Sequence, residues 1–145
     1  MKIAIGSDHG GFELKAVIVK HLKDKNVGVI DLGPSVKESV HYPVYGIRVA
    51  EAVQGKQADL GIVVCSTGEG ICIAANKVKG IRCGLIYDDN SAHLTKEHNN
   101  CNVIAFGQKT MTEKDVLKRL DIFLDARFEG GRHQDRLDII SNYEK

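Results

Sequence analysis

The chain has 145 residues, 43% of them apolar, which is enough to bury the core of one ordinary domain without help from a metal or disulfides. The 20 Lys and Arg residues are balanced by 19 Asp and Glu residues, so the formal net charge is only +1. This balance excludes recruitment of nucleic acid or an anionic membrane by bulk charge. We therefore expect no nucleic-acid partner, and function should reside in a local site.

Cysteine usage and the N-terminus both point to a reducing compartment. The cysteines form no CxxC pair, and the N-terminal "MKIAI" reaches the polar "GSDHGG" after only three apolar residues, unlike a signal peptide. No apolar run approaches the ~20 residues that a membrane-spanning helix needs. We therefore expect a reduced, cytoplasmic protein with no membrane partner. The four cysteines are Cys65, Cys72, Cys83 and Cys101.

Short segments rich in Val and Ile alternate with amphipathic stretches of helical length. Three of these stretches, at 12–23, 42–53 and 113–126, predict helices that cover a sheet on one side. In the first, we expect the apolar stripe to consist of Phe12, Ala16, Val19 and Leu22. The predicted strands cover residues 2–6, 27–31, 60–64, 82–87 and 102–107.

The strands read as nearly continuous apolar runs, which is typical of a parallel sheet buried on both faces. The predicted fold is therefore a three-layer α/β/α sandwich with a Rossmann-like, five-stranded parallel sheet. No linker, repeat or low-complexity tract divides the chain, so residues 1–145 should form a single domain. The glycine pair at 130–131 predicts a break before a short final helix that packs outside the main layers.

In such sheets, ligands bind beyond the carboxyl ends of the strands. The segments that follow the first, third and fourth strands are "GSDHGG" (6–11), "CSTGEG" (65–70) and "DDNSAHLTKEHNN" (88–100), and all three carry groups that do chemistry. Neither glycine loop matches a dinucleotide or P-loop motif, and Ile71 stands where a cysteine phosphatase needs an arginine. His93 and His98 lie about 140° apart around a helix, so their side chains do not converge on one metal ion. We therefore expect no required metal and no cofactor.

The "CSTGEG" loop can hold negative charge. Gly68 and Gly70 permit a tight turn that leaves amides exposed at the start of a helix, where an oxyanion is favoured. The same positive end would favour the thiolate form of Cys65, which could then act as a base or nucleophile, and Thr67 could relay a proton. The residues alone leave a second interpretation open, in which Cys65 is a small buried apolar residue and the glycines only shape a turn.

Basic residues in two further places are candidates for substrate contacts. His9 lies in a glycine-flanked loop at the ligand edge, although it could instead cap a turn. His98 ends a predicted helix and could simply complement the helix dipole. Arg132 and Arg136 share one face of the last helix, which suits a phosphate, but the acidic neighbours Asp135 and Asp138 make an ordinary salt-bridged surface the default interpretation from these residues alone.

Five motifs occur in a recognisable order: "GSDHGG", "YPVYG", "CSTGEGICIAANKVKGIR", "EHNNCNVIAFG" and "FEGGRHQDR". Together they closely resemble the type B ribose-5-phosphate isomerases and the related galactose-6-phosphate isomerase subunits, over nearly the whole chain. The resemblance implies a metal-free aldose–ketose isomerase that interconverts ribose 5-phosphate and ribulose 5-phosphate in the pentose phosphate pathway. It also implies a homodimer or tetramer with active sites at the subunit interface.

The resemblance further implies roles for individual residues. Cys65 would shuttle the proton through an enediolate, and Thr67 and His98 would assist ring opening. Asp8 and Asn99 would hold sugar hydroxyls, while a cluster of basic residues would hold the phosphate. The implied substrate-binding residues are Asp8, His9, Ser66, Gly68, Glu69, Gly70, Asn99, Lys109, Arg132 and Arg136.

The sequence departs from the family pattern at four positions. Lys109 stands where the family commonly has a phosphate-binding arginine, so a bidentate contact becomes a point charge. Ser66 replaces a frequent glycine, Glu69 puts an acid in the loop, and Cys72 replaces a small residue behind it. A six-carbon substrate, galactose 6-phosphate or allose 6-phosphate, and a non-catalytic sugar-phosphate sensor are the alternatives. Cys65 and His98 together favour the pentose enzyme.

Overall fold

A computed structural model describes all 145 residues and contains one parallel sheet of five strands. The strands lie in the order β2-β1-β3-β5-β4, so β5 is inserted between β3 and β4. The observed strands agree with the predicted ones except that the fourth is shorter. Their bounds are β1 (Lys2–Ser7), β2 (Gly28–Asp31), β3 (Leu60–Cys65), β4 (Cys83–Leu85) and β5 (Val103–Gly107).

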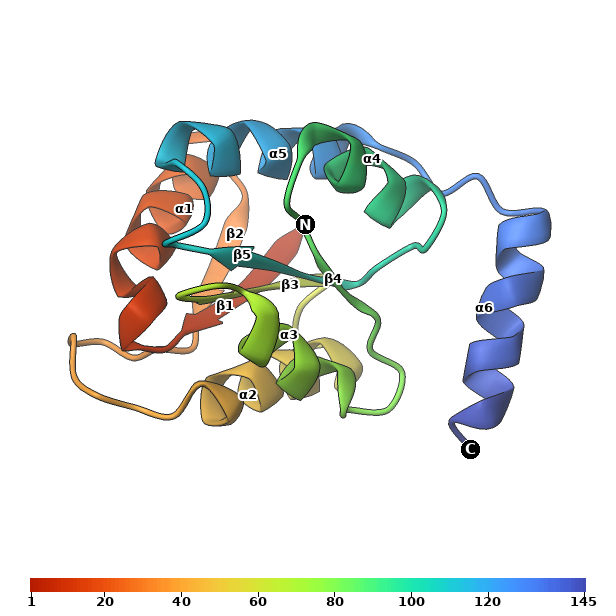
Figure 1. The fold of residues 1–145 in the computed structure, drawn as a ribbon, viewed down its shortest axis with the longest axis horizontal. Helices are drawn as coiled ribbons and strands as arrows, with labels where there is room; N and C mark the ends of the chain where they lie inside the picture. The colour runs from red at the N-terminus through yellow and green to blue at the C-terminus, as the bar shows by residue number, and fades with distance from the viewer.

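Helices cover both faces of this sheet. As Figure 1 shows, α1, α4 and α5 lie on one face, α2 and α3 lie on the other, and α6 stands apart at the side. The predicted three-layer α/β/α sandwich is therefore confirmed, and the last helix lies outside the layers as expected. The helices are α1 (Phe12–Asp24), α2 (Tyr42–Gln54), α3 (Glu69–Asn76), α4 (Asp89–Glu97), α5 (Glu113–Asp125) and α6 (Arg132–Tyr143), and a short 3₁₀ turn, η1 (His9–Gly11), precedes α1.

Alternation along each strand divides the core into two clusters, because successive side chains of a strand point to opposite faces. In β1, Ile3 and Ile5 pack toward α1, α4 and α5, whereas Ala4 packs toward α2 and α3. In β5, Phe106 and Ala105 divide in the same way. Both faces of the sheet are therefore buried, which explains why the sequences of the strands are nearly continuous apolar runs.

The predicted apolar stripe of α1 is confirmed for Leu22 and for the partly buried Val19, which packs against the core, but it is wrong for Phe12 and Ala16. Leu14, Ile18 and Leu22 form the buried face, each 0–2% exposed and spaced four residues apart. Apolar residues surround much of this helix, and only the tertiary structure selects which stripe meets the sheet. Phe12, Ala16 and Val19 line part of a surface hollow of about 490 Å³.

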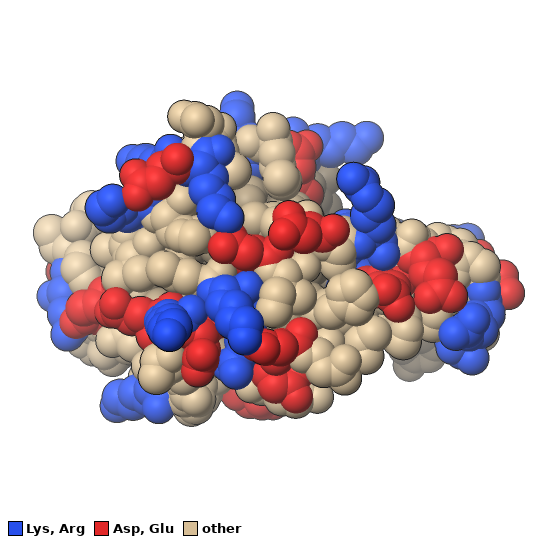
Figure 2. All heavy atoms as spheres, turned by 90° about the horizontal axis from the view of Figure 1, so that it is seen from above, with Lys and Arg blue, Asp and Glu red and all other residues tan.

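The face that α1, α4 and α5 cover carries both signs of charge. Figure 2 shows Lys and Arg interspersed with Asp and Glu across it, so this face presents no extended field of one sign. None of the helices has the length and the apolar character that crossing a membrane requires.

Candidate active site

Cys65 ends β3 at the carboxyl edge of the sheet, and its sulfur accepts a hydrogen bond from the turn that follows. The Gly68 N–H donates to Cys65 Sγ at 3.1 Å, and the Glu69 N–H donates to Thr67 Oγ1 at 3.2 Å. Gly68 caps α3 with a φ of +81°, a conformation that favours glycine. The sulfur therefore lies by a helix-start amide, as expected. Cys65 is also only 5% exposed, so it is a buried residue as well.

Two neighbouring loops close tightly around this turn. A Cβ atom at Gly10 would lie 2.2 Å from Ser66 Oγ, and one at Gly107 would lie 2.5 Å from the Thr67 carbonyl oxygen. The Lys109 N–H also donates to the Ser66 carbonyl at 2.8 Å. The backbone of residues 107–109 therefore packs directly against the backbone of Ser66 and Thr67. We call this group, residues 8–11, 65–70 and 107–109, the Cys65 loop cluster.

Asp8 and His9 both belong to the Cys65 loop cluster, with different exposure. Asp8 is 7% exposed, and its Oδ1 accepts a hydrogen bond from the Gly10 N–H at 2.9 Å. His9 is exposed, and its Nδ1 accepts from the Val40 N–H at 3.3 Å. Asp8 therefore shapes the loop, while His9 lies at its outer surface.

Tyr42 is a neighbour of the Cys65 loop cluster that the sequence reasoning missed. A Cβ at Gly70 would lie 2.8 Å from ring atoms Cε1 and Cζ of Tyr42, so the ring packs directly against the loop. The tyrosine lies in the quoted "YPVYG" motif, but nothing in its spacing to Cys65 indicates this contact. Only the packing of α2 against α3 creates it.

A second group of predicted residues gathers in a pocket of about 290 Å³ between the end of α4 and α6. His98 ends α4, and its imidazole stacks on that of His133 with 4.1 Å between ring centroids and 16° between planes. We call this the His98 pocket. Its lining residues are His98, Asn99, Arg132, His133, Arg136, Leu137 and Ile140.

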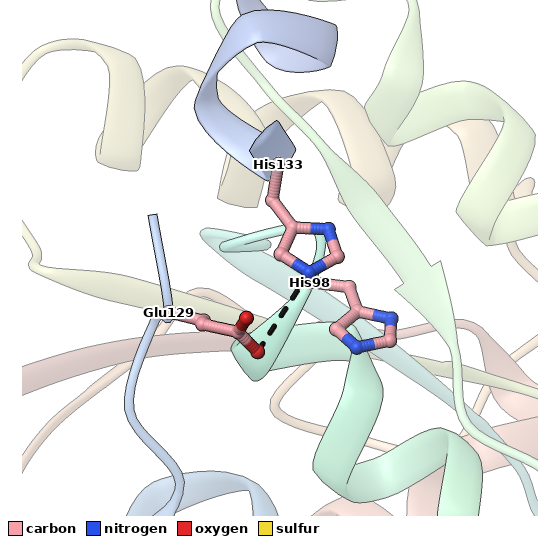
Figure 3. Close-up of side chains that lie close together, drawn as sticks. All are labelled: His98, Glu129 and His133. Atoms are coloured by element: carbon pink, nitrogen blue, oxygen red, sulfur yellow. Dashed lines mark ion pairs between the residues drawn. The ribbon is translucent and has the colours of Figure 1, made fainter. Parts of the chain in front are cut away.

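His133 in the His98 pocket and Glu129 beside it are features that spacing did not reveal. His133 is 5% exposed, its Nε2 has no hydrogen-bond partner, and this nitrogen lies 3.7 Å from Glu129 Oε2 (Figure 3). Burial lowers the pKa of His133, and the charges of His98 and Arg132 lower it further. His133 is therefore held in its neutral form more strongly than a free histidine.

The two arginines of the His98 pocket differ in their partners. Arg132 Nη1 lies 3.4 Å from Oε1 of Glu129, which precedes α6. Arg136 makes no ion pair. The interpretation as a salt-bridged helix surface therefore does not apply to Arg136, which is exposed and has no ion-pair partner.

The structure separates the predicted site residues into these two groups. Cys65 pairs with Gly107 at the end of β5, whereas His98 and Asn99 come before Val103 at its start. The five residues of β5 span roughly 13 Å. In Figure 1, α6 accordingly stands at the opposite end of the sheet from the loop that joins β3 to α3. The 88–100 segment therefore begins at the ligand edge, but α4 returns it to the other edge.

Comparison with known proteins identifies the family. Residues 3–140 match the family model described as Ribose/Galactose Isomerase. The chain belongs to the ribose/galactose isomerase family. The resemblance that the motifs indicated is therefore confirmed over nearly the whole chain.

Relatives within the ribose/galactose isomerase family are similar along their full length. The chain is 46% identical to the ribose-5-phosphate isomerase B of Escherichia coli over 144 residues, covering 99% of this chain and 97% of the relative. A structure of the Clostridium thermocellum ribose-5-phosphate isomerase B superposes with a TM-score of 0.98 at 46% identity, covering 99% and 97% of the two chains. The Mycoplasma genitalium ribose-5-phosphate isomerase B, solved with bound ribulose-5-phosphate, superposes with a TM-score of 0.95 at 44% identity, covering 99% and 95%.

Proposed function

We propose that residues 1–145 form a single sugar-phosphate isomerase domain that interconverts ribose 5-phosphate and ribulose 5-phosphate. The observation that carries this proposal is the Cys65 sulfur, which accepts the Gly68 N–H at the start of α3. Full-length similarity to ribose-5-phosphate isomerases B, one of them with bound ribulose-5-phosphate, supports this substrate over a six-carbon phosphate. The four free cysteines fit a reducing compartment such as the cytoplasm.

The reaction needs one group that moves a proton between adjacent carbons. The Cys65 thiolate takes the proton from C2 of the open-chain sugar, which gives an enediolate; the hydroxyl proton then passes from O2 to O1, and the resulting thiol returns its proton to C1. The Gly68 N–H, donated to the sulfur, stabilises its negative charge before the transfer. The amides of Gly68 and Glu69 donate within the loop, so those of Ser66, Thr67 and Gly70 are the candidate donors to the enediolate oxygen.

Ring opening and substrate binding use the remaining predicted residues. Thr67 is exposed in the loop after Cys65, and His98 would act with it on the ring oxygen and the anomeric hydroxyl. Asp8 and Asn99 would bind sugar hydroxyls. The phosphate would be held by His9, Lys109, Arg132 and Arg136, far from the reacting carbons, which fixes the orientation of C1 and C2.

These assignments require a second copy of the chain, because Cys65 and His98 lie at opposite ends of the sheet. In a homodimer or tetramer, the His98 pocket of one subunit would face the Cys65 loop cluster of another. Exposed apolar side chains offer surfaces for such a contact. They include Ile139, Ile140 and Tyr143 on α6, and Val44, Ile47 and Ile73 on α2 and α3.

The first test is turnover of ribose 5-phosphate by the purified chain in the presence of a chelator. Cys65→Ala should lower kcat by at least about 100-fold, which is within the range for loss of a general base, while substrate still binds. Turnover that survives in Cys65→Ala would reject the cysteine as the base. Preferred turnover of galactose 6-phosphate or allose 6-phosphate would reject the pentose assignment, and binding without any turnover would indicate a sensor.

Mixing two inactive variants tests whether one site uses two subunits. Cys65→Ala and His98→Asn chains, unfolded and refolded together, should recover about a quarter of parent activity, because half of the randomly paired dimers contain one intact site. Separately refolded samples are the control. If Cys65 and His98 act within one chain, every site in the mixture carries a defect and no activity returns.

A further inference from the structure

Two side chains of the His98 pocket and one beside it converge from separate segments of the chain. One nitrogen of His98, one nitrogen of His133 and one carboxylate oxygen of Glu129 lie within 4.8 Å of one another. His98 comes from the end of α4, Glu129 from the segment after α5, and His133 from the first turn of α6 (Figure 3). We propose that these three residues form a binding site for a transition-metal ion such as Zn²⁺, and that the bound ion inhibits the isomerase.

The chemistry of the ligand set favours zinc. Two imidazoles and one carboxylate are a common set of protein ligands for Zn²⁺, with an open fourth position. The His133 side chain is 5% exposed, and its Nε2 has no hydrogen-bond partner although it is directed at Glu129. A buried nitrogen without a partner is costly, and a metal ion would satisfy it.

Binding requires one ring to move, because a metal ion lies in the plane of each imidazole that ligates it. The rings are now nearly parallel at 4.1 Å, so they cannot share an ion as stacked. His133 is 5% exposed and His98 is 36% exposed, and the only ion-pair contact of the His98 ring is Glu97 at 3.7 Å. His98 is therefore the ring that turns, and the ligand atoms close from within 4.8 Å to the spacing of about 3.3 Å in a tetrahedral zinc site.

Inhibition follows from the use of His98, and this part rests on the proposed function. A nitrogen bonded to Zn²⁺ cannot exchange a proton with the sugar, and the ion would occupy the pocket that the substrate enters. The arginines of the pocket repel a cation, and Arg132 already contacts the other oxygen of Glu129. Metal and sugar phosphate should therefore compete, with the substrate favoured in the absence of excess metal.

Direct binding decides whether the site exists. Calorimetric titration of the Cys65→Ser chain with ZnCl₂ removes the catalytic thiol as a ligand, and we expect saturable binding of one ion per chain. Adding Glu129→Gln should weaken that binding at least tenfold. Glu129 is 44% exposed, and the substitution preserves its shape, so the fold should survive. Glu38→Gln, at an exposed position without a side-chain contact, is the matched control and should leave binding unchanged. The absence of saturable binding, or equal binding in Glu129→Gln, would overturn the site.

Activity separates the site from its effect. In the parent, Zn²⁺ should raise the KM for ribose 5-phosphate and a chelator should restore it, with at least tenfold more Zn²⁺ needed in Glu129→Gln. Zinc that binds through Glu129 without inhibiting would overturn the inhibitory role. A parent that does not isomerise ribose 5-phosphate would overturn the proposed function, while the calorimetric result would still decide the metal site.

Discussion

The Cys65 loop cluster and the His98 pocket are held together by different forces. Backbone contacts define the first: a Cβ at Gly107 would meet the Thr67 backbone, the Lys109 N–H donates to the Ser66 carbonyl, and the Gly68 amide donates to the sulfur. Side chains define the second, through the His98–His133 stack and ion pairs at 3.4 to 3.7 Å around Glu129. A backbone-built site holds its atoms within a narrow range, whereas a side-chain pocket can rearrange.

This difference matches the demands of the proposed reaction. Proton transfer requires the sulfur to be placed within a few tenths of an ångström, so a substitution that displaces the sulfur should lower the rate strongly. Phosphate binding tolerates adjustment by long, flexible side chains, so substitutions in the His98 pocket should reduce substrate affinity by smaller amounts. The following predictions test this contrast, from the largest expected effect to the smallest.

Gly107→Ala should cause the largest loss. Its Cβ would lie 2.5 Å from both the carbonyl carbon and oxygen of Thr67, and backbone atoms there cannot move aside cheaply. We expect the free energy of unfolding to fall by about 1–3 kcal/mol, and kcat/KM to fall by about 100-fold or more. Denaturant unfolding and steady-state kinetics measure the two effects. Gly28→Ala is the control, because its nearest contact is 3.4 Å away. Full activity in Gly107→Ala would show that the loop is not rigid.

Arg136→Ala should weaken binding without disturbing the Cys65 loop cluster. Loss of a charge-assisted contact to phosphate corresponds to a rise in KM of about 10- to 100-fold, and kcat should change less. Because Arg136 makes no ion pair, stability should stay near that of the parent. Steady-state kinetics with Arg127→Ala, an exposed arginine outside the pocket, provides the comparison. A loss confined to kcat would contradict a role in phosphate binding.

Thiol reactivity should distinguish the surroundings of the two regions. The Cys83 thiol, as a hydrogen-bond donor, lowers the pKa of Cys72, on α3 behind the Cys65 loop cluster, whereas burial raises the pKa of Cys101 to about 11. At a mildly alkaline pH, iodoacetamide should modify Cys72 about tenfold or more faster than Cys101, because the thiolate is the reactive form. Mass spectrometry of the peptides measures the rates. The difference should vanish in denaturant, and equal rates in the folded chain would reject it.

Asp121→Asn should have the smallest effect, because it touches neither region. Burial opposes the charge of Asp121, but hydrogen bonds from Lys25 and His21 outweigh it and lower its pKa below 3.8. The folded state therefore binds this proton less tightly than the unfolded state, so the contribution is present above pH 3.8 and is lost as the pH falls through the lowered pKa. We expect a loss of about 0.2–1 kcal/mol at neutral pH.

Thermal unfolding at several pH values measures the contribution of Asp121. The difference between Asp121→Asn and the parent should shrink at acidic pH. Asp125→Asn, on the exposed side of the same helix, should show no such dependence. A change in kcat for Asp121→Asn would contradict the separation of this ion pair from both regions.

Much of the fold could be predicted because it depends on near neighbours in the chain. The bounds of most strands follow from runs of Val and Ile, and the turn at Gly68 follows from the need for a positive φ. The buried stripe of α1 was predicted only in part, because two apolar stripes on that helix compete and only contact with the sheet decides between them.

The sequence by itself determined the layered fold and the family, and it indicated the chemistry that we propose for Cys65 and the loop after it. Only the tertiary structure decided which of these groups meet. Insertion of β5 between β3 and β4 and the return of the chain along α4 carry His98 away from Cys65 and against Glu129 and His133. Strand order depends on packing over both faces of the sheet at once, and no local pattern encodes it. For that reason the two halves of the candidate site, and the three convergent ligands beside α6, were visible only in the folded chain.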